Sequence, residues 1–202
     1  MTPFTILRSP VLPVLEDRVD TDVIFPARFL LLMQRGEMGR YFFADQRFAS
    51  DGTVIAEHPV NDPRYAGAKI LVTGADFGCG SSREQAVWAM TSFGIRCVIA
   101  ESLGEIFAAN CLRNGVLAIT QPRKVIGALA ELGEPVEVDL EAQEIRAGTV
   151  IYPFAIPPAH RERLLNGWDD IDLILANEGD HLATFEARQR LLQPWLYGAH
   201  HD

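Results

Sequence analysis

Cysteine is scarce in this sequence, and the few cysteines form no pattern. Cys79, Cys97 and Cys111 are odd in number and widely spaced. Disulfide frameworks need paired cysteines, and closed zinc or iron–sulfur sites need ligands at short, regular spacings. The sequence therefore predicts reduced thiols and no metal or cluster held by this chain alone.

A long apolar run is also missing. No stretch approaches the roughly 20 apolar residues that a membrane-spanning helix requires. The apolar part of the N-terminal segment is short, is interrupted by Pro10 and Pro13, and lacks the small-residue cleavage pattern of a secretory signal. We therefore expect a cytoplasmic protein with no membrane partner.

Positive charge is in deficit. The chain has 18 Lys and Arg against 27 Asp and Glu, which gives a formal net charge of −9. A surface of this sign repels the phosphate backbone of nucleic acids. A nucleic-acid partner is therefore disfavoured.

Internal repeats, low-complexity runs and Gly/Ser-rich linkers are absent, so nothing in the composition divides the chain. Its 202 residues are 48% hydrophobic and 22% charged, which is typical of a soluble globular protein with a sizeable core. We predict a single domain over residues 1–202, with a core at about 1–155 and a helical extension at about 157–193.

The clearest pattern lies between residues 69 and 120. Three apolar runs, KILVT, RCVIA and VLAIT, alternate with two segments of helical periodicity. The first helix is expected to begin near Ser82 and the second at Ser102, because a capping box fits both starts. One face is expected to carry Ala86, Val87, Met90 and Phe93 in the first helix and Leu103, Ile106, Phe107 and Asn110 in the second, with Gly115 as a left-handed terminus. Connections of this length join parallel strands, so we predict a parallel sheet covered by helices.

The flanking segments are less regular. VLPVLE is expected to be a strand, ARFLLLMQRG a short helix and VIGALAEL a further helix. VEVDL and EIRAGTVIYPF predict a hairpin around residues 141–143. From residue 157 to 190 the apolar spacing predicts two or three helices with a break at Asn166-Gly167.

A glycine-rich loop between the first of these strands and its helix reads GADFGCGSSREQ, residues 74–85. The glycines permit close backbone approaches, and the segment leads into a helix N-terminus with unpaired amides. A carboxylate could meet these amides, the hydroxyl of Ser81 or Ser82 and the guanidinium of Arg83 together. A strand-to-helix turn with a capping serine and an exposed arginine explains the same residues without a ligand. Their coincidence at the carboxyl end of a parallel strand favours a binding site.

A nucleotide site is the competing interpretation. Gly78-x-Gly80-x-x-Arg83 imitates the first two glycines of the dinucleotide fingerprint, and Glu101 stands near the position of its ribose-binding acid. Arg83, however, occupies the place of the third glycine. Cys79 is a weaker candidate, because no nearby histidine would activate it as a nucleophile.

A second constellation, DTDVIFPARFL at residues 20–30, supports two interpretations equally. Asp22 could orient a catalytic group or an arginine, while Arg28 could hold a carboxylate. Alternatively, Asp20 and Thr21 cap a turn, Pro26 opens a helix and Arg28 faces water.

Together the segments DFGCGSSREQAVWAM and DTDVIFPARFL resemble the small-subunit family of 3-isopropylmalate dehydratase, in the aconitase superfamily. Further segments with this resemblance, such as VIAESLGEIFAANCLRNGVLAI and LLNGWDDIDLILANEGDHLATFEARQ, extend it over most of the chain. It implies an α/β fold, a swivelling three-layer β/β/α domain with a central parallel sheet and C-terminal helices. It also implies a large partner subunit that carries a [4Fe-4S] cluster.

The resemblance assigns roles to residues. Ser81 would be the base that removes a proton from carbon, and Asp22 would match the catalytic aspartate of the earlier motif. Gly80, Ser82, Arg83 and Arg28 would bind the substrate, a dicarboxylic hydroxy acid. The implied reaction is a hydro-lyase isomerisation of 2- and 3-isopropylmalate through 2-isopropylmaleate, in leucine biosynthesis.

One departure concerns Gln85, which stands where most relatives have histidine after the S-S-R-E run. Substrate identity therefore stays open, and citramalate, dimethylmalate and homoaconitate dehydratases are alternatives of the same architecture. A stand-alone anion- or nucleotide-binding module is the alternative from another class.

Overall fold

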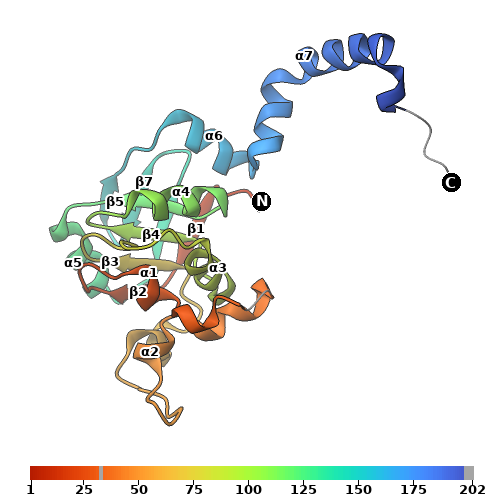
Figure 1. The fold of residues 1–202 in the computed structure, drawn as a ribbon. Coiled ribbons are helices and arrows are strands. Elements are labelled where there is room, and N and C mark those ends of the chain that lie inside the picture. The colour runs from red at the N-terminus through yellow and green to blue at the C-terminus, as the bar shows by residue number, and fades with distance from the viewer. Residues whose placement is uncertain (32–33, 198–202) are drawn as a thin grey trace. The chain divides into compact units, whose positions relative to one another are not determined.

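The computed structural model describes residues 1–31 and 34–197, and contacts within the chain divide it into two compact units, Met1–Gly167 and Trp168–Asp202. The first unit contains two four-stranded sheets and most of the helices (Figure 1). The division follows Gly167, so the first terminal helix belongs to the first unit. That both units act as one swivelling domain stays a prediction.

One sheet is entirely parallel, as the apolar runs predict. Its strands follow the order β2 (Val11–Val14), β3 (Ile70–Thr73), β4 (Cys97–Ala100) and β5 (Leu117–Thr120). Ile70 pairs with Cys97, which in turn pairs with Leu117, so the strands end level at their carboxyl ends. Every residue of β3 and β4 is buried, because both faces of the sheet are covered.

The other sheet is antiparallel. Its strands follow the order β1 (Ile6–Ser9), β6 (Val136–Asp139), β7 (Glu144–Ala147) and β8 (Val150–Pro153). The predicted hairpin is confirmed, with Gln143 in the left-handed region at φ +56° between β6 and β7. The segment EIRAGTVIYPF forms two strands rather than one, because Gly148 turns the chain at φ +59°.

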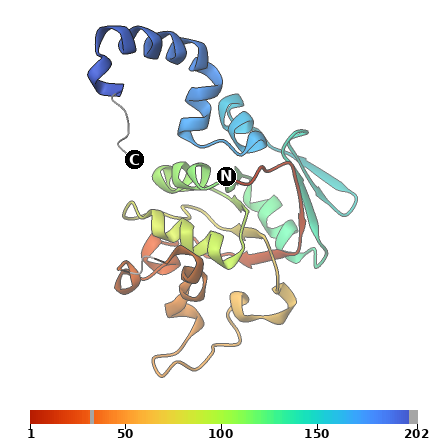
Figure 2. The ribbon, with the colours of Figure 1, turned by 90° about the vertical axis from the view of Figure 1, so that its right-hand side faces the viewer.

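Side chains of the parallel sheet alternate between two hydrophobic cores, and this creates three layers. Ile70 and Val72 pack towards the antiparallel sheet, in a core that includes Val138 and Ile145. Leu71 faces the opposite way, into a core with the helices. The predicted β/β/α architecture is therefore present, and Figure 2 shows the antiparallel strands set apart from the parallel ones.

The helical layer consists chiefly of α3 (Glu84–Phe93) and α4 (Glu105–Arg113). The expected α3 stripe is largely right, since Ala86, Val87 and Met90 are buried and Phe93 is half-buried. On α4, Phe107 and Cys111 face the core, whereas Ile106, expected on that face, is 53% exposed. Gly115 adopts φ +71° after α4, as predicted.

Both predicted capping boxes are wrong. α3 begins at Glu84 with Arg83 as its N-cap, and α4 begins at Glu105 with Gly104 as its N-cap, in each case without a side-chain capping bond. The side chain of Ser102 instead binds Asp76 in the neighbouring loop: its Oγ accepts from the Asp76 N–H (2.8 Å) and donates to the carboxylate (3.0 Å).

Short helices fill the segment between β2 and β3. They are α1 (Thr21–Ile24), η1 (Ala27–Phe29), η2 (Arg35–Tyr41), α2 (Ala44–Arg47), η3 (Pro59–Asn61) and η4 (Pro63–Tyr65). The helix expected over 27–36 is replaced by η1 and the start of η2, and residues 32–33 lie outside the described part. Downstream, the predicted helix α5 (Arg123–Glu131) is confirmed.

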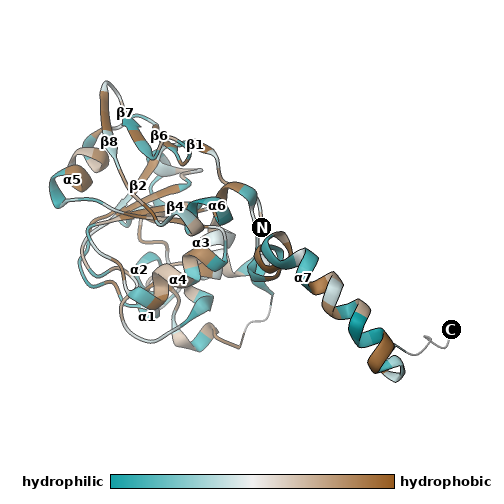
Figure 3. Ribbon diagram, turned by 90° about the horizontal axis from the view of Figure 1, so that it is seen from above, coloured by the Kyte–Doolittle hydropathy of each residue, from teal (hydrophilic) through white to brown (hydrophobic). Residues whose placement is uncertain are grey.

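The terminal helices are α6 (Pro158–Asn166) in the first unit, then α7 (Asp170–Leu192) and η5 (Pro194–Tyr197) in the second. Gly167 ends α6 at φ +68°, at the predicted break, and Asp169 and Asp172 form a capping box for α7. Apolar and polar residues alternate along α7 (Figure 3). None of the helices in residues 1–31 and 34–197 combines the length and the apolar character that a membrane span needs.

Candidate active site

Two loops run side by side at the carboxyl end of the parallel sheet. The segment after β2 reaches Asp20, and the glycine-rich loop after β3 reaches Cys79, where the two chains form a parallel bridge. The Gly78 N–H donates to the Val19 carbonyl at 2.8 Å, and the Thr21 N–H donates to the Cys79 carbonyl at 3.0 Å. The two motifs that the sequence singled out, which lie far apart along the chain, are therefore in contact.

The bend between Gly78 and Gly80 requires glycine for two reasons. Both residues lie in the left-handed region, at φ +74° and +87°. In addition, a Cβ on Gly78 would overlap the ring of Phe107, and a Cβ on Gly80 would overlap the carboxylate of Asp20. The bend therefore packs tightly against residues of its own chain.

Beyond this bend the chain presents a pair of hydroxyls to solvent. Ser81 and Ser82 are both exposed, while Arg83, the next residue, is half-buried. The Arg83 guanidinium forms an ion pair with the Asp22 carboxylate, and their side chains are 19% and 46% exposed. The structure thus brings Asp22, Ser81, Ser82 and Arg83 together, as a binding site for a carboxylate would need.

Arg28 is in a different environment. Its Nη1 donates to Asp45 Oδ2 at 2.8 Å, and its guanidinium stacks over the ring of Phe29 at 4.4 Å. The hydrogen bond from Arg28 lowers the pKa of Asp45. Both side chains of the pair are 55% exposed and line an open cavity of about 580 Å³ with Tyr41. The contacts of Arg28 are therefore with its own segment and not with the Ser81 loop.

The capped-turn interpretation of residues 20–30 also describes real features. Asp20 Oδ1 accepts from the Asp22 N–H at 2.7 Å and caps α1, and Pro26 precedes η1. Asp20 and Thr21 therefore build the turn, while Asp22 extends from it to Arg83. The two interpretations apply to different residues of the same motif.

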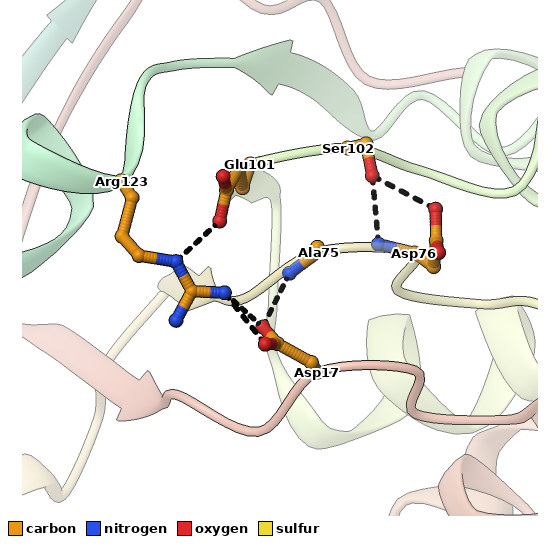
Figure 4. A network of polar contacts seen from close by, with 6 residues as sticks. All are labelled: Asp17, Ala75, Asp76, Glu101, Ser102 and Arg123. Atoms are coloured by element: carbon orange, nitrogen blue, oxygen red, sulfur yellow. Dashed lines mark hydrogen bonds and ion pairs between the residues drawn. The ribbon is translucent and has the colours of Figure 1, made fainter.

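Sequence reasoning missed a polar network at the same end of the sheet (Figure 4). Arg123, which begins α5, donates from Nη2 to both Asp17 oxygens at 2.6 Å and from Nε to Glu101 at 2.7 Å. Asp17 also accepts from the Ala75 N–H at 2.8 Å. The position of each residue shortly after a strand is the signal that could have found this network.

This network joins the loops that follow all four parallel strands. The hydrogen bonds from Arg123 and Ala75 lower the pKa of the Asp17 carboxyl. Glu101, which the nucleotide interpretation makes the ribose ligand, instead forms an ion pair with Arg123.

The cysteines differ in accessibility. Cys79 is half-buried in the loop, whereas Cys97 and Cys111 are completely buried, and burial raises the pKa of both thiols. Across residues 1–31 and 34–197, no group of three or more His, Cys, Asp or Glu side chains is arranged to hold a metal ion.

Known proteins share the sequence and the fold of this chain over most of its length. Residues 1–124 match the model of the aconitase C-terminal domain. The 3-isopropylmalate dehydratase small subunits of Rhodospirillum centenum and Parvibaculum lavamentivorans are 43% and 44% identical, over 98% and 97% of this chain and 100% of each relative. The crystal structure of 3-isopropylmalate dehydratase (LeuD) from Methanocaldococcus jannaschii superposes with a TM-score of 0.66 at 26% identity, covering 89% of this chain and 99% of that one. The chain therefore belongs to the small-subunit family of 3-isopropylmalate dehydratase, which carries the aconitase C-terminal domain.

Proposed function

We propose that this chain is the small subunit of a cytoplasmic hydro-lyase that interconverts 2- and 3-isopropylmalate through 2-isopropylmaleate, in leucine biosynthesis. One observation carries the proposal. In a chain related over almost its whole length to such subunits, an exposed Ser81 hydroxyl lies on a glycine bend, two residues before an arginine that is anchored by Asp22. The bend thus combines a base with a carboxylate-binding group.

Ser81 acts in this proposal as the base that takes the proton from the substrate carbon. An alcohol is a weak base at neutral pH, so its alkoxide needs stabilisation by nearby positive potential. Arg83 and the first amides of α3 follow Ser81 directly in the chain. A well-placed donor of this kind is worth about 3 kcal/mol in a site that excludes water.

Arg83 binds a substrate carboxylate, together with Ser82 and the backbone at Gly80. Asp22 acts on the substrate through Arg83, since its carboxylate fixes the direction of the guanidinium. The remaining N–H groups of Arg83 have no partner among residues 1–31 and 34–197, which leaves them free for a carboxylate. Arg28 contributes to binding in this proposal only after its exposed pair with Asp45 opens.

The large subunit supplies the iron–sulfur cluster in this proposal. The described residues of this chain include no group of three or more His, Cys, Asp or Glu side chains arranged for a metal ion, and the proposal assigns the cysteine ligands of the cluster to the partner. When bound there, the cluster would supply Lewis-acid activation of the substrate hydroxyl. The exposed loop at Ser81 and Ser82 would then lie against the large subunit and complete the site.

The test is reconstitution with the large subunit of the same organism. The complex is expected to interconvert 2- and 3-isopropylmalate, and Ser81→Ala is expected to abolish turnover without loss of subunit association. Thr149→Ala, which removes an exposed hydroxyl in the β7–β8 turn, is the matched control and should retain full activity. Full activity of Ser81→Ala would remove Ser81 as the base.

Substrate identity is tested separately, because half-buried Gln85 departs from the usual histidine. The reconstituted pair is assayed against isopropylmalate, citramalate, dimethylmalate and homoaconitate. The highest kcat/KM is expected for isopropylmalate. A higher kcat/KM for another acid would leave the proposed role of Ser81 unchanged and would identify that acid as the substrate.

A further inference from the structure

Among the described residues, the Ser81 backbone has a single hydrogen-bond partner. The carbonyl oxygen of Ser81 accepts from the hydroxyl of Thr21 at 2.8 Å. No other hydrogen bond in the part of the chain that the structure describes involves the Ser81 backbone or side chain. The position of this exposed loop residue therefore depends on one buried threonine.

Thr21 is well placed to hold the loop rigidly. Its side chain is only 2% exposed, and its N–H donates to the Cys79 carbonyl at 3.0 Å. The backbone ladder between the two loops ends at Cys79, because Gly80 turns away at φ +87°. The hydroxyl of Thr21 thus extends the ladder past the bend to Ser81.

The alternative acceptor for this hydroxyl is weaker. Asp20 Oδ1 lies 3.4 Å from Thr21 Oγ1, but it already accepts from the Asp22 N–H at 2.7 Å. A hydroxyl has one proton to donate, and the Ser81 carbonyl at 2.8 Å has the better geometry.

We propose that Thr21 is a positioning residue, whose hydroxyl holds the Ser81 backbone so that the Ser81 side chain is directed at the substrate carbon. The inference rests on the proposed function of Ser81 as the base. Thr21 itself touches no substrate, since it is buried beneath the bend.

The expected effect is catalytic and not structural. Replacement of the hydroxyl by a methyl group of similar size removes one part-buried hydrogen bond, which is worth about 1 kcal/mol. Stability should therefore change little. A reacting group displaced by about 1 Å can lose about 100-fold in rate, so a drop of about 10- to 100-fold in kcat is expected with little change in KM.

Two variants of Thr21 separate the hydroxyl from packing. Thr21→Val keeps the volume and loses the hydroxyl, while Thr21→Ser keeps the hydroxyl and loses the methyl group. We expect Thr21→Ser to be the less stable protein and the better enzyme, with kcat close to wild type. If Thr21 had a purely structural role, the less stable of the two variants would also be the less active one.

Thr73→Val is the matched control. Thr73 is fully buried at the end of β3, directly before the loop, and its hydroxyl has no hydrogen-bond partner within the described residues. The same chemical change there should leave kcat unaltered. Equal losses in Thr73→Val and Thr21→Val would attribute the effect to packing and overturn the proposal.

Hydrogen–deuterium exchange of the full chain gives a readout that does not depend on the substrate. The peptide covering residues 77–83 should exchange faster in Thr21→Val than in wild type, and at the wild-type rate in Thr21→Ser. An inactive wild-type complex would refute the proposed function alone, because the exchange result still reports whether Thr21 holds the loop. Unchanged exchange in Thr21→Val, or faster exchange with full activity, would refute the positioning role.

Discussion

Substitution of Gly78 by alanine tests the packing of the loop in a way that can be calculated. Gly78 has φ +74°, and a Cβ there would overlap the Phe107 ring, with two ring carbons at 2.6 Å. Phe107 cannot easily move, because it is 2% exposed and packs edge-on against Phe77 with 5.4 Å between ring centroids. The substitution therefore combines backbone strain with steric overlap.

The two contributions can be separated with Gly67→Ala. Gly67 has the same φ of +74°, but nothing lies within 4 Å of a Cβ built on it. A non-glycine residue in the left-handed region costs about 1 kcal/mol, and that is the expected loss at Gly67. Overpacking adds about 1–3 kcal/mol, so Gly78→Ala should destabilise the protein by about 2–4 kcal/mol.

Urea unfolding followed by circular dichroism measures both free energies of unfolding from the midpoint and the slope. The double variant Gly78→Ala, Phe107→Leu should be more stable than the sum of the single losses predicts, because the smaller side chain relieves the overlap. Equal losses in Gly67→Ala and Gly78→Ala, within about 0.5 kcal/mol, would refute the steric argument.

Three further predictions concern titratable and reactive groups. Iodoacetamide should alkylate Cys79 in the native protein and should reach the buried Cys97 and Cys111 only after denaturation. The intact mass of the protein measures the number of labelled thiols. Rapid labelling of all three in the native protein would contradict the burial of Cys97 and Cys111. Arg123 lowers the pKa of Asp17 in the folded protein. The ionised Asp17 therefore stabilises the fold above the unfolded pKa of 3.8, and this stabilisation is lost as the pH falls below 3.8. The difference in Tm between wild type and Asp17→Asn should shrink from pH 7 to pH 3. Burial lowers the pKa of His58 in the folded protein, and its Nδ1 accepts from the Val60 N–H at 3.3 Å. The fold therefore favours the neutral imidazole, and stability is lost as the pH falls below the unfolded pKa of 6.5. His58→Asn keeps a capping acceptor and should flatten the dependence of Tm on pH between 7 and 5, whereas an unchanged slope would exclude His58 as its source.

The strand–helix–strand pattern of residues 69–120 was predictable because it depends on local information. Each apolar run is long enough for one strand, and the spacing of Ala86, Val87 and Met90 repeats with the helical period. The helix starts were not predictable in the same way. Ser102 fits a capping box in sequence, yet its hydroxyl binds Asp76, a partner that only the tertiary fold brings near.

The segment between β2 and β3 shows the same limit more strongly. The helix η2 is held against α3 by Ser92, whose Oγ accepts from the Gly39 N–H at 3.0 Å and donates to the Gly36 carbonyl at 2.9 Å. Phe43 precedes α2 in the left-handed region, at φ +55°. Such turns depend on long-range contacts, and no periodic pattern in the sequence announces them.

The candidate site was only partly predictable from the sequence. The Ser81-to-Arg83 run was recognisable from sequence, and so was the DTD motif, because each has unusual composition. Their contact was not recognisable: the Asp22–Arg83 ion pair and the hydrogen bond from Thr21 to Ser81 join residues separated by 61 and 60 positions. Likewise, the link from Arg123 to Asp17 spans 106 positions. Composition marked the candidate residues, while the fold determined which of them lie in contact.

The glycines of the loop show why local sequence also supported a nucleotide site. In a dinucleotide fold, glycines of this spacing let the backbone approach a pyrophosphate. Here the space beside Gly80 is filled by the Asp20 carboxylate and the space beside Gly78 by the Phe107 ring. A carboxylate at that place repels a phosphate, and Glu101 is already paired with Arg123. The glycines therefore serve contacts within the chain, and the anion site that we propose lies past the bend, at Ser81, Ser82 and the guanidinium of Arg83.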